Sequence, residues 1–110
     1  MKNKEILRGI AASSGRVVGK VIIVKNPVKT IKPIPGAIIV APFTTPVIAS
    51  AIAVSAGIIC EKGGLTSHGA IIAREFNIPC MVGVKNALKV LKNNQEIILD
   101  ANKTIIYETK

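Results

Sequence analysis

The hydrophobic and polar positions along this chain predict short buried strands that alternate with short helices. The apolar runs Ala37–Ala41 and Gly57–Cys60 show no polar alternation, which is typical of strands buried on both faces. Cys80–Val82 predicts a further strand, and the segments Val47–Ser55 and Ser67–Phe76 predict helices between the strands. Because strands and helices alternate, the middle of the chain is expected to form a parallel sheet with helices on a face.

Both ends of the chain are richer in strand signals. Residues 1–12 predict a lead-in strand, and Arg16–Val24 predicts a second strand because it is rich in β-branched residues. Glu96–Asp100 and Lys103–Tyr107 predict a β-hairpin with Asn102 in its turn. These segments are expected to add antiparallel strands, so the fold class is α/β. A chain of 110 residues is short enough to form a single domain over its whole length, 1–110.

Proline, glycine and threonine mark the boundaries between these elements. The segment Lys25–Gly36 is rich in proline and is predicted to be a turn region. Thr44, Thr45 and Pro46 predict a helix start, with a threonine hydroxyl as the N-cap and the proline at the first helical position. A further short helix is predicted over Ala87–Leu91.

The charge balance favours anionic partners. The chain has 15 Lys and Arg against 6 Asp and Glu, a formal net charge of +9. Phosphorylated small molecules, acidic protein surfaces and nucleic acids would all suit this charge. Aromatic residues make up only 3% of the chain and tryptophan is absent, so there is little to stack on bases, and no nucleic-acid partner is expected. The lysines are scattered along the sequence, as they also are on an ordinary solvated basic surface.

Neither a secretory signal nor a membrane span is predicted. Glu5 and Arg8 interrupt the start of the chain, and the long apolar stretch over residues 46–60 contains Ser and Gly and is too short to cross a bilayer. Cys60 and Cys80 are too few for a disulfide framework or a metal cluster, and we expect them to be small buried residues with reduced thiols. We therefore expect a cytoplasmic protein with no membrane partner.

The chemistry of the chain is concentrated in the run Gly63–His68, between a predicted strand and a predicted helix. Folds of the α/β class place ligands at the carboxyl ends of parallel strands. Glycines such as Gly63 and Gly64 let backbone N–H groups point into one concavity, and a helix N-terminus adds unpaired N–H groups and partial positive charge. Together they predict a site for an anion such as phosphate, to which Thr66 and Ser67 would add hydroxyl donors.

His68 is the only histidine in the chain, and it follows this predicted anion site directly. An imidazole is a nucleophile near neutral pH, so it could accept a phosphoryl group and hold it as a phosphoramidate. Other chemistries fit less well. A metal site needs several clustered ligands, which a single histidine does not provide, and the Walker pattern of a phosphate-binding loop is absent. A Ser-His-Asp hydrolase needs an orienting carboxylate, and Asp100 is the only Asp in the chain. Ser67 is adjacent to the histidine, and neighbouring side chains usually point apart. A histidine that only caps or packs at the helix start is the structural alternative.

The run from Gly63 to Arg74, followed by Ile78-Pro79 and Val82-Gly83, resembles the phosphohistidine swivelling (mobile) domain of phosphoenolpyruvate-utilising enzymes. That family includes phosphoenolpyruvate synthase, pyruvate phosphate dikinase, enzyme I of the sugar phosphotransferase system and rifampicin phosphotransferase. The resemblance also covers three further segments, Gly15–Val24, Ile38–Pro46 and Gln95–Tyr107. It implies a three-layer β/β/α swivelling domain with a central parallel sheet and additional antiparallel strands.

The resemblance assigns roles to particular residues. His68 matches the family's phosphoryl acceptor, which is phosphorylated on Nε2, and Gly63, Gly64 and Thr66 match residues that surround it. In the family the domain swings between an ATP-grasp nucleotide-binding domain and a barrel that binds phosphoenolpyruvate or pyruvate; enzyme I instead passes the group to a small carrier protein. No cofactor or metal is expected on this domain, and Mg²⁺ is expected with ATP or phosphoenolpyruvate on the partners.

Two further residues are candidates for supporting the site. Thr45, like its neighbour Thr44, matches a position near the family's active face, although a helix cap is the simpler interpretation. Arg74 also matches a family position, but six residues after His68 it points about 120° away around a helix. A structural ion pair is therefore favoured over contact with the phosphoryl group. Lys62 flanks the glycine loop, the segment 63–67 that begins with Gly63 and Gly64. There it would screen negative charge or serve as an ordinary surface lysine.

Two positions depart from the family pattern. Gly69 follows the histidine where the family usually has Ala, Ser or Thr, and glycine there would loosen the helix start by up to about 1 kcal/mol. Val47 follows Thr-Pro where many relatives carry an acidic residue, which affects any partner contact made by this segment. The sequence predicts a phosphoryl-carrier domain that is a component of a phosphotransferase and not a complete enzyme alone. The alternative is a non-catalytic binding or regulatory module that retains the fold and the anion pocket.

Overall fold

The computed structural model describes residues 3–63 and 68–109. The described residues form strands β1 (Lys4–Arg8), β2 (Ile10–Ser13), β3 (Arg16–Ile23), β4 (Ile38–Ala41), β5 (Gly57–Cys60), β6 (Cys80–Val82), β7 (Glu96–Asp100) and β8 (Ile105–Glu108). The helices among them are the 3-10 helix η1 (Pro46–Ile48) and the α-helices α1 (Ala49–Val54), α2 (His68–Glu75) and α3 (Ala87–Val90). In these two ranges no helix has the length and apolar character needed to cross a bilayer.

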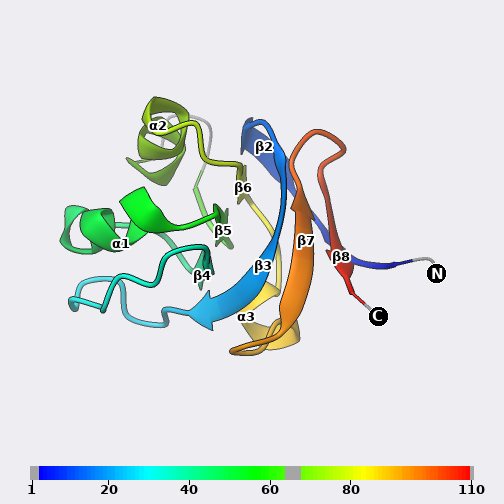
Figure 1. Cartoon of the computed structure of the whole chain (residues 1–110), viewed down its shortest axis with the longest axis horizontal. Helices are drawn as coiled ribbons and strands as arrows, with labels where there is room; N and C mark the ends of the chain where they lie inside the picture. The colour runs from blue at the N-terminus through cyan, green and yellow to red at the C-terminus, as the bar shows by residue number, and fades with distance from the viewer. Residues whose placement is uncertain (1–2, 64–67, 110) are drawn as a thin grey trace.

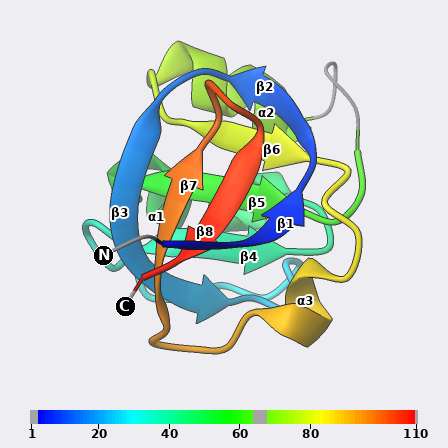
Figure 2. The same cartoon turned by 90° about the vertical axis from the view of Figure 1, so that its right-hand side faces the viewer.

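The strands pair in the order β1-β8-β7-β3-β4-β5-β6-β2. Strands β3 to β6 are parallel to one another, whereas β1, β8, β7 and β2 join by antiparallel pairing. The long, curved β3 pairs with β7 on one side and with β4 on the other, so it belongs to both layers of the sheet (Figure 2). Helices α1 and α2 cover the outer face of the parallel layer (Figure 1). The result is the expected β/β/α arrangement.

The unbroken apolar runs are explained by burial on both faces. In β4, Ile39 and Ala41 pack under the helices, while Ile38 and Val40 fill the space between the two strand layers. Strand β5 alternates in the same way, and both strands are buried along their whole length. Helix α3, at the lower end of the molecule in Figure 1, contributes Ala87 to the core between the two strand layers.

The prediction of one lead-in strand over residues 1–12 is wrong, because the chain bends at Gly9 into β1 and β2. Strand β1 pairs with β8, whereas β2 pairs with β6 at the other end of the strand order. A Cβ at Gly9 would lie 2.5 Å from Cγ2 of Val84 and 2.9 Å from the carbonyl oxygen of Val82. Position 9 therefore has no room for a side chain, and this close approach lets the chain cross between the layers.

The remaining predicted strands are confirmed to within about two residues, and so is the hairpin β7–β8. The side-chain amide oxygen of Asn102, in the hairpin turn, accepts a hydrogen bond from the backbone N–H of Gly15 at 2.9 Å. This bond ties the turn to the start of β3. The predicted helix over Val47–Ser55 is present as η1 followed by α1.

Candidate functional site

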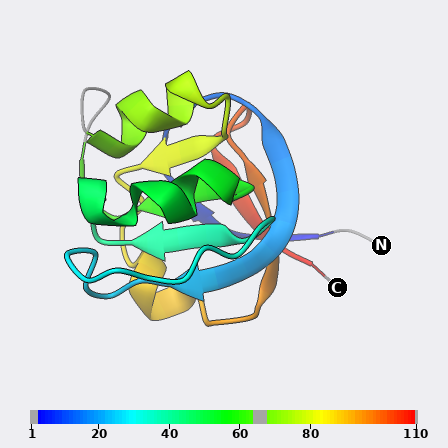
Figure 3. The same cartoon turned by 60° about the vertical axis from the view of Figure 1, so that its left-hand side comes forward.

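The carboxyl ends of the parallel strands meet at one edge of the molecule, on the left in Figure 3. Backbone hydrogen bonds hold the segments that leave this edge side by side. The N–H of Glu61 donates to the carbonyl oxygen of Ala41 at 3.1 Å, and the N–H of Lys62 donates to that of Pro42 at 3.0 Å. The segment after β5, which leads to the predicted glycine loop, therefore runs beside the segment after β4.

His68 is the first residue of α2 and is half-buried. Its ring nitrogen Nδ1 lies 3.0 Å from Oγ1 of Thr44, a residue 24 positions earlier in the chain. Thr44 sits in the segment after β4, and α2 follows β5, so the adjacency of these two parallel strands brings the pair together. A hydroxyl that forms a hydrogen bond with Nδ1 helps to fix the orientation of the imidazole ring.

From the sequence, Thr44 is expected only as a neighbour of Thr45 near the family's active face, and in the structure its hydroxyl contacts the histidine directly. The sequence had suggested that Thr44 and Thr45 cap the following helix. The strand order supplies the missing information, because β4 and β5 are neighbours, and the segment after β4 that holds Thr44 therefore runs beside the start of the segment after β5.

Gly69 packs against the same threonine. Gly69 is buried, and a Cβ at this position would lie 2.7 Å from Oγ1 and 3.2 Å from Cγ2 of Thr44. Contacts this close are not available to a real Cβ without movement of a neighbour. The glycine that departs from the usual family residue therefore gives Thr44 its place beside His68, a role that its helix propensity did not suggest.

The expectation that a threonine hydroxyl caps the helix at Pro46 is wrong. Thr45 occupies the N-cap position with an extended backbone, but its side chain makes no capping hydrogen bond. Its hydroxyl donates instead to the carbonyl oxygen of Pro27 at 2.5 Å. This contact joins the segment after β4 to the turn region after β3. The placement of Pro46 at the start of the helix is confirmed.

Arg74 lies in the last turn of α2. Its Nη1 donates to the carbonyl oxygen of Ala12, in β2, at 2.9 Å. This bond anchors the last turn of the helix to β2.

The glycine loop is described in part. Gly63 is exposed and has φ of +96°, the left-handed conformation expected of a glycine in such a loop. The predicted phosphate-binding residues Gly64, Thr66 and Ser67 lie outside the described residues, so their role remains a prediction. Residues 3–63 and 68–109 contain no group of three or more His, Cys, Asp or Glu side chains placed to hold a metal ion.

Both cysteines are buried, as expected. Cys60 is the last residue of β5 and Cys80 is the first residue of β6, and both side chains belong to the core under the helices. Burial raises the pKa of the Cys60 thiol from its ordinary value of 9.0 to about 12. Burial is also the main cause that raises the pKa of Cys80 to about 12, with a smaller contribution from Cys60. Both thiols are therefore protonated and unreactive near neutral pH, although Cys60 immediately precedes the histidine loop.

Comparison with known proteins identifies the class to which this fold and site belong. The family described as PEP-utilising enzyme, mobile domain, matches residues 33–104. The chain belongs to this family of mobile domains. A probable phosphoenolpyruvate synthase of Methanothermobacter thermautotrophicus is 42% identical over 109 residues, which is 98% of this chain and 16% of that protein. The chain thus spans less than a fifth of that relative's length.

Solved structures support the same fold. An Enzyme I protein is 30% identical, with a TM-score of 0.57 over 66% of this chain and 30% of that one. Aconitase X of Thermococcus kodakaraensis has a TM-score of 0.76 over 94% of this chain and 98% of that one, and at 20% identity the likeness shows the fold alone. The chain is therefore a domain related to phosphotransfer, and its relatives are parts of larger enzymes.

Proposed function

We propose that His68 carries a phosphoryl group between a donor site and an acceptor site on partner domains. The observation that carries this proposal is the contact of 3.0 Å between Oγ1 of Thr44 and Nδ1 of His68. A histidine that only capped α2 would have no need for a separate segment to hold one ring nitrogen. A ring held through Nδ1 is prepared for chemistry at Nε2.

The hydroxyl of Thr44 can either donate to Nδ1 of His68 or accept from it, and the proposed reaction uses the second arrangement. When Nδ1 carries the proton and donates it to Oγ1 of Thr44, Nε2 keeps its lone pair. Nε2 then attacks the phosphorus of the donor: the N–P bond forms while the bond from phosphorus to the leaving oxygen breaks, and that oxygen takes the electron pair. The positive charge that develops on the ring lies next to the hydroxyl oxygen of Thr44. At the acceptor site the same steps run in reverse, with an oxygen nucleophile and Nε2 as the leaving group.

The start of α2 stabilises the phosphorylated state. Unpaired N–H groups and the partial positive charge of a helix N-terminus are worth about 0.3–1 kcal/mol to an adjacent anion. We propose that Gly63, Gly64, Thr66 and Ser67 complete the cradle for the three phosphoryl oxygens. The phosphoryl group would then be bound by the loop and held covalently by the histidine.

Donor and acceptor belong to the partners in this proposal. We propose an ATP-grasp nucleotide-binding domain and a phosphoenolpyruvate- or pyruvate-binding barrel as the two docking sites, with Mg²⁺ bound there together with the substrates. The cytoplasm is the compartment that fits, because reduced thiols such as Cys60 and Cys80 persist there.

Labelling tests the proposal. The purified chain is incubated with an extract of the source cells and either labelled phosphoenolpyruvate or ATP labelled at the β or γ phosphate, beside the His68→Ala variant. We expect label on the wild type alone, removed by acid and stable to alkali, as for a phosphoramidate. A folded wild type that takes no label from any donor would favour the non-catalytic binding module.

A further inference from the structure

The edge of the molecule that holds His68 is strongly basic. The segments that leave the carboxyl ends of β3, β5 and β6 carry exposed lysines at positions Lys25, Lys29, Lys62 and Lys85. The described parts of these segments contain one acidic residue, Glu61. Its carboxylate accepts a hydrogen bond from the backbone N–H of Leu88 at 2.9 Å, so it is engaged as a cap on α3. One carboxylate against four lysines leaves the described part of this edge with a net positive charge.

The turn that carries two of these lysines is fixed beside the histidine. The carbonyl oxygen of Pro27 accepts the hydroxyl of Thr45, whose neighbour Thr44 contacts His68. Within the turn, the N–H of Lys29 donates to the carbonyl oxygen of Asn26 at 3.2 Å. These bonds place Lys25 and Lys29 on the same edge as the reactive ring.

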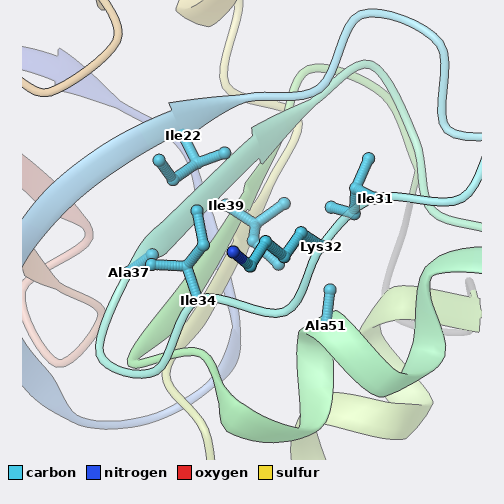
Figure 4. Close-up of a pocket in the computed structure, with 7 residues that line it drawn as sticks. All are labelled: Ile22, Ile31, Lys32, Ile34, Ala37, Ile39 and Ala51. Atoms are coloured by element: carbon cyan, nitrogen blue, oxygen red, sulfur yellow. The ribbon is translucent and has the colours of Figure 1, made fainter.

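In the rest of that turn region, Ile31 packs against the core under the helices. Ile31 and Ile34 lie over Ile22 and Ile39, and the aliphatic stem of Lys32 crosses them (Figure 4). The space left between these side chains is about 10 Å³, which is too small for a ligand. The turn region is therefore attached to the core through Ile31, while residues 32–36 are exposed.

Large apolar side chains are also exposed on this edge. Phe43 and Val47, on either side of the two threonines, are 42% and 44% exposed. Ile71, one turn after His68 on α2, is 47% exposed. Apolar side chains that gather next to a functional group and are surrounded by charge mark a surface for contact with another protein.

We propose that this edge, which we name the lysine face (Lys25, Lys29, Lys62 and Lys85 around Phe43, Val47 and Ile71), docks on an acidic protein surface. This inference rests on the proposed function, because the docked partner is the one that presents the phosphoryl donor to Nε2. The apolar residues require a protein surface on the other side, since a small phosphorylated molecule would leave them uncovered. The lysines at the rim require carboxylates opposite them, and they steer the encounter.

Charge reversal on the lysine face tests this docking. The Lys25→Glu/Lys29→Glu variant is compared with Lys4→Glu/Lys103→Glu, which makes the same change of net charge at exposed positions in β1 and in the turn between β7 and β8, away from the carboxyl end of β3. The initial labelling rate is measured at limiting amounts of the source-cell extract. We expect the first variant to be slower by about 10-fold or more at low salt, because steered association depends on such charges, and the control to be near the wild-type rate. Raising the salt to about 1 M, where the screening length falls to about 3 Å, is expected to remove most of the difference.

Two further measurements make the result specific. Potassium phosphoramidate, a small reagent that phosphorylates histidine without a protein donor, is expected to label both double variants at the wild-type rate. Phe43→Gln is expected to slow labelling by the extract in a manner that salt does not relieve, because it removes apolar contact and no charge.

Several results would contradict the proposal that the lysine face docks on an acidic protein surface. Equal slowing of both double variants would mean that net charge alone matters. Equal slowing with phosphoramidate would mean that the lysines act on the phosphoryl donor itself. Suppression of wild-type labelling by added DNA would point to a nucleic-acid surface. A wild type that phosphoramidate labels and no extract labels would contradict the proposed function, and the docking face with it.

Discussion

Gly69 and Thr44 fit together only because position 69 has no side chain: a Cβ there would lie 2.7 Å from Oγ1 of Thr44. The same Oγ1 lies 3.0 Å from Nδ1 of His68, so the glycine indirectly fixes the position of the histidine ring. Gly69 has a low helix propensity, but its lack of a side chain makes it part of the site. The pair couples the segment after β4 to the first turn of α2.

Replacing Gly69 by Ala is expected to slow phosphoryl transfer by about 10-fold, because the displaced Thr44 loses a hydrogen bond worth about 1.5 kcal/mol to a charged ring. The gain in helix propensity of up to about 1 kcal/mol would be offset by the contact with Thr44. The labelling rate and the free energy of unfolding are measured together.

The Gly69→Ala/Thr44→Ala double variant is the control for this change. Removing the threonine side chain makes room for the new methyl group, so stability is expected to recover while transfer stays slow. Full transfer activity in Gly69→Ala alone would show that Thr44 does not depend on the glycine.

Thr44→Val keeps the shape of the side chain and removes the hydroxyl. We expect transfer to fall by about 10- to 100-fold, as for the loss of a hydrogen bond of about 1.5–3 kcal/mol to a charged group. Thr44→Ser retains the hydroxyl and is expected to keep most of the activity. Nitrogen NMR of the wild-type imidazole is expected to show the proton on Nδ1, and a proton found on Nε2 would contradict the assigned role of Thr44.

The two buried thiols make the stability of the fold sensitive to alkaline pH. Burial raises the pKa of Cys60 and of Cys80 from 9.0 to about 12, so the folded state holds protons that the unfolded state releases. This contribution to stability is fully present below pH 9 and is lost as the pH rises toward 12. Denaturant unfolding at a series of pH values is expected to show that the free energy of unfolding falls above pH 9. The same measurement on the Cys60→Ala/Cys80→Ala variant is expected to show a smaller fall.

Thiol alkylation measures the burial of the two cysteines more directly. Iodoacetamide near pH 8 is expected to leave both cysteines unmodified in the folded protein and to modify both in denaturant, because both thiols are buried. Rapid alkylation of Cys60 in the folded protein would mean that the start of the histidine loop opens readily.

Replacing Gly9 by Ala is expected to destabilise the fold by about 1–3 kcal/mol, the usual cost of forcing extra atoms into a packed core. The added Cβ would meet both the side chain of Val84 and the backbone oxygen of Val82. Adding Val84→Ala would relieve only the first contact, so this second change is expected to give no full rescue. Unchanged stability of Gly9→Ala would mean that the bend between β1 and β2 adjusts freely.

The sequence predicts the interior of this fold better than its connections. Ile38 to Ala41 and Gly57 to Cys60 could be assigned as strands because residues buried on both faces leave an unbroken apolar run. The bend at Gly9 could not be predicted, since it depends on contact with Val82 and Val84, far away in the chain. A local pattern does not record such long-range contacts.

The same distinction applies to the site. His68 and the glycine loop could be singled out because their residues are consecutive, and the described structure places His68 at the start of α2 as expected. The contact with Thr44 spans 24 residues and follows from the pairing of β4 with β5. The hydroxyl of Thr45 was assigned to a helix cap on local grounds, and the neighbouring turn at Pro27 takes it instead.

The most direct test of the carrier function is to locate the phosphoryl group after labelling by the source-cell extract. The account predicts an acid-labile, alkali-stable phosphoryl group on Nε2 of His68, identified by phosphorus NMR and by mass spectrometry of the peptide, and absent from His68→Ala. Label that survives in His68→Ala, or a folded wild type that remains unlabelled while phosphoramidate modifies it, would contradict the account.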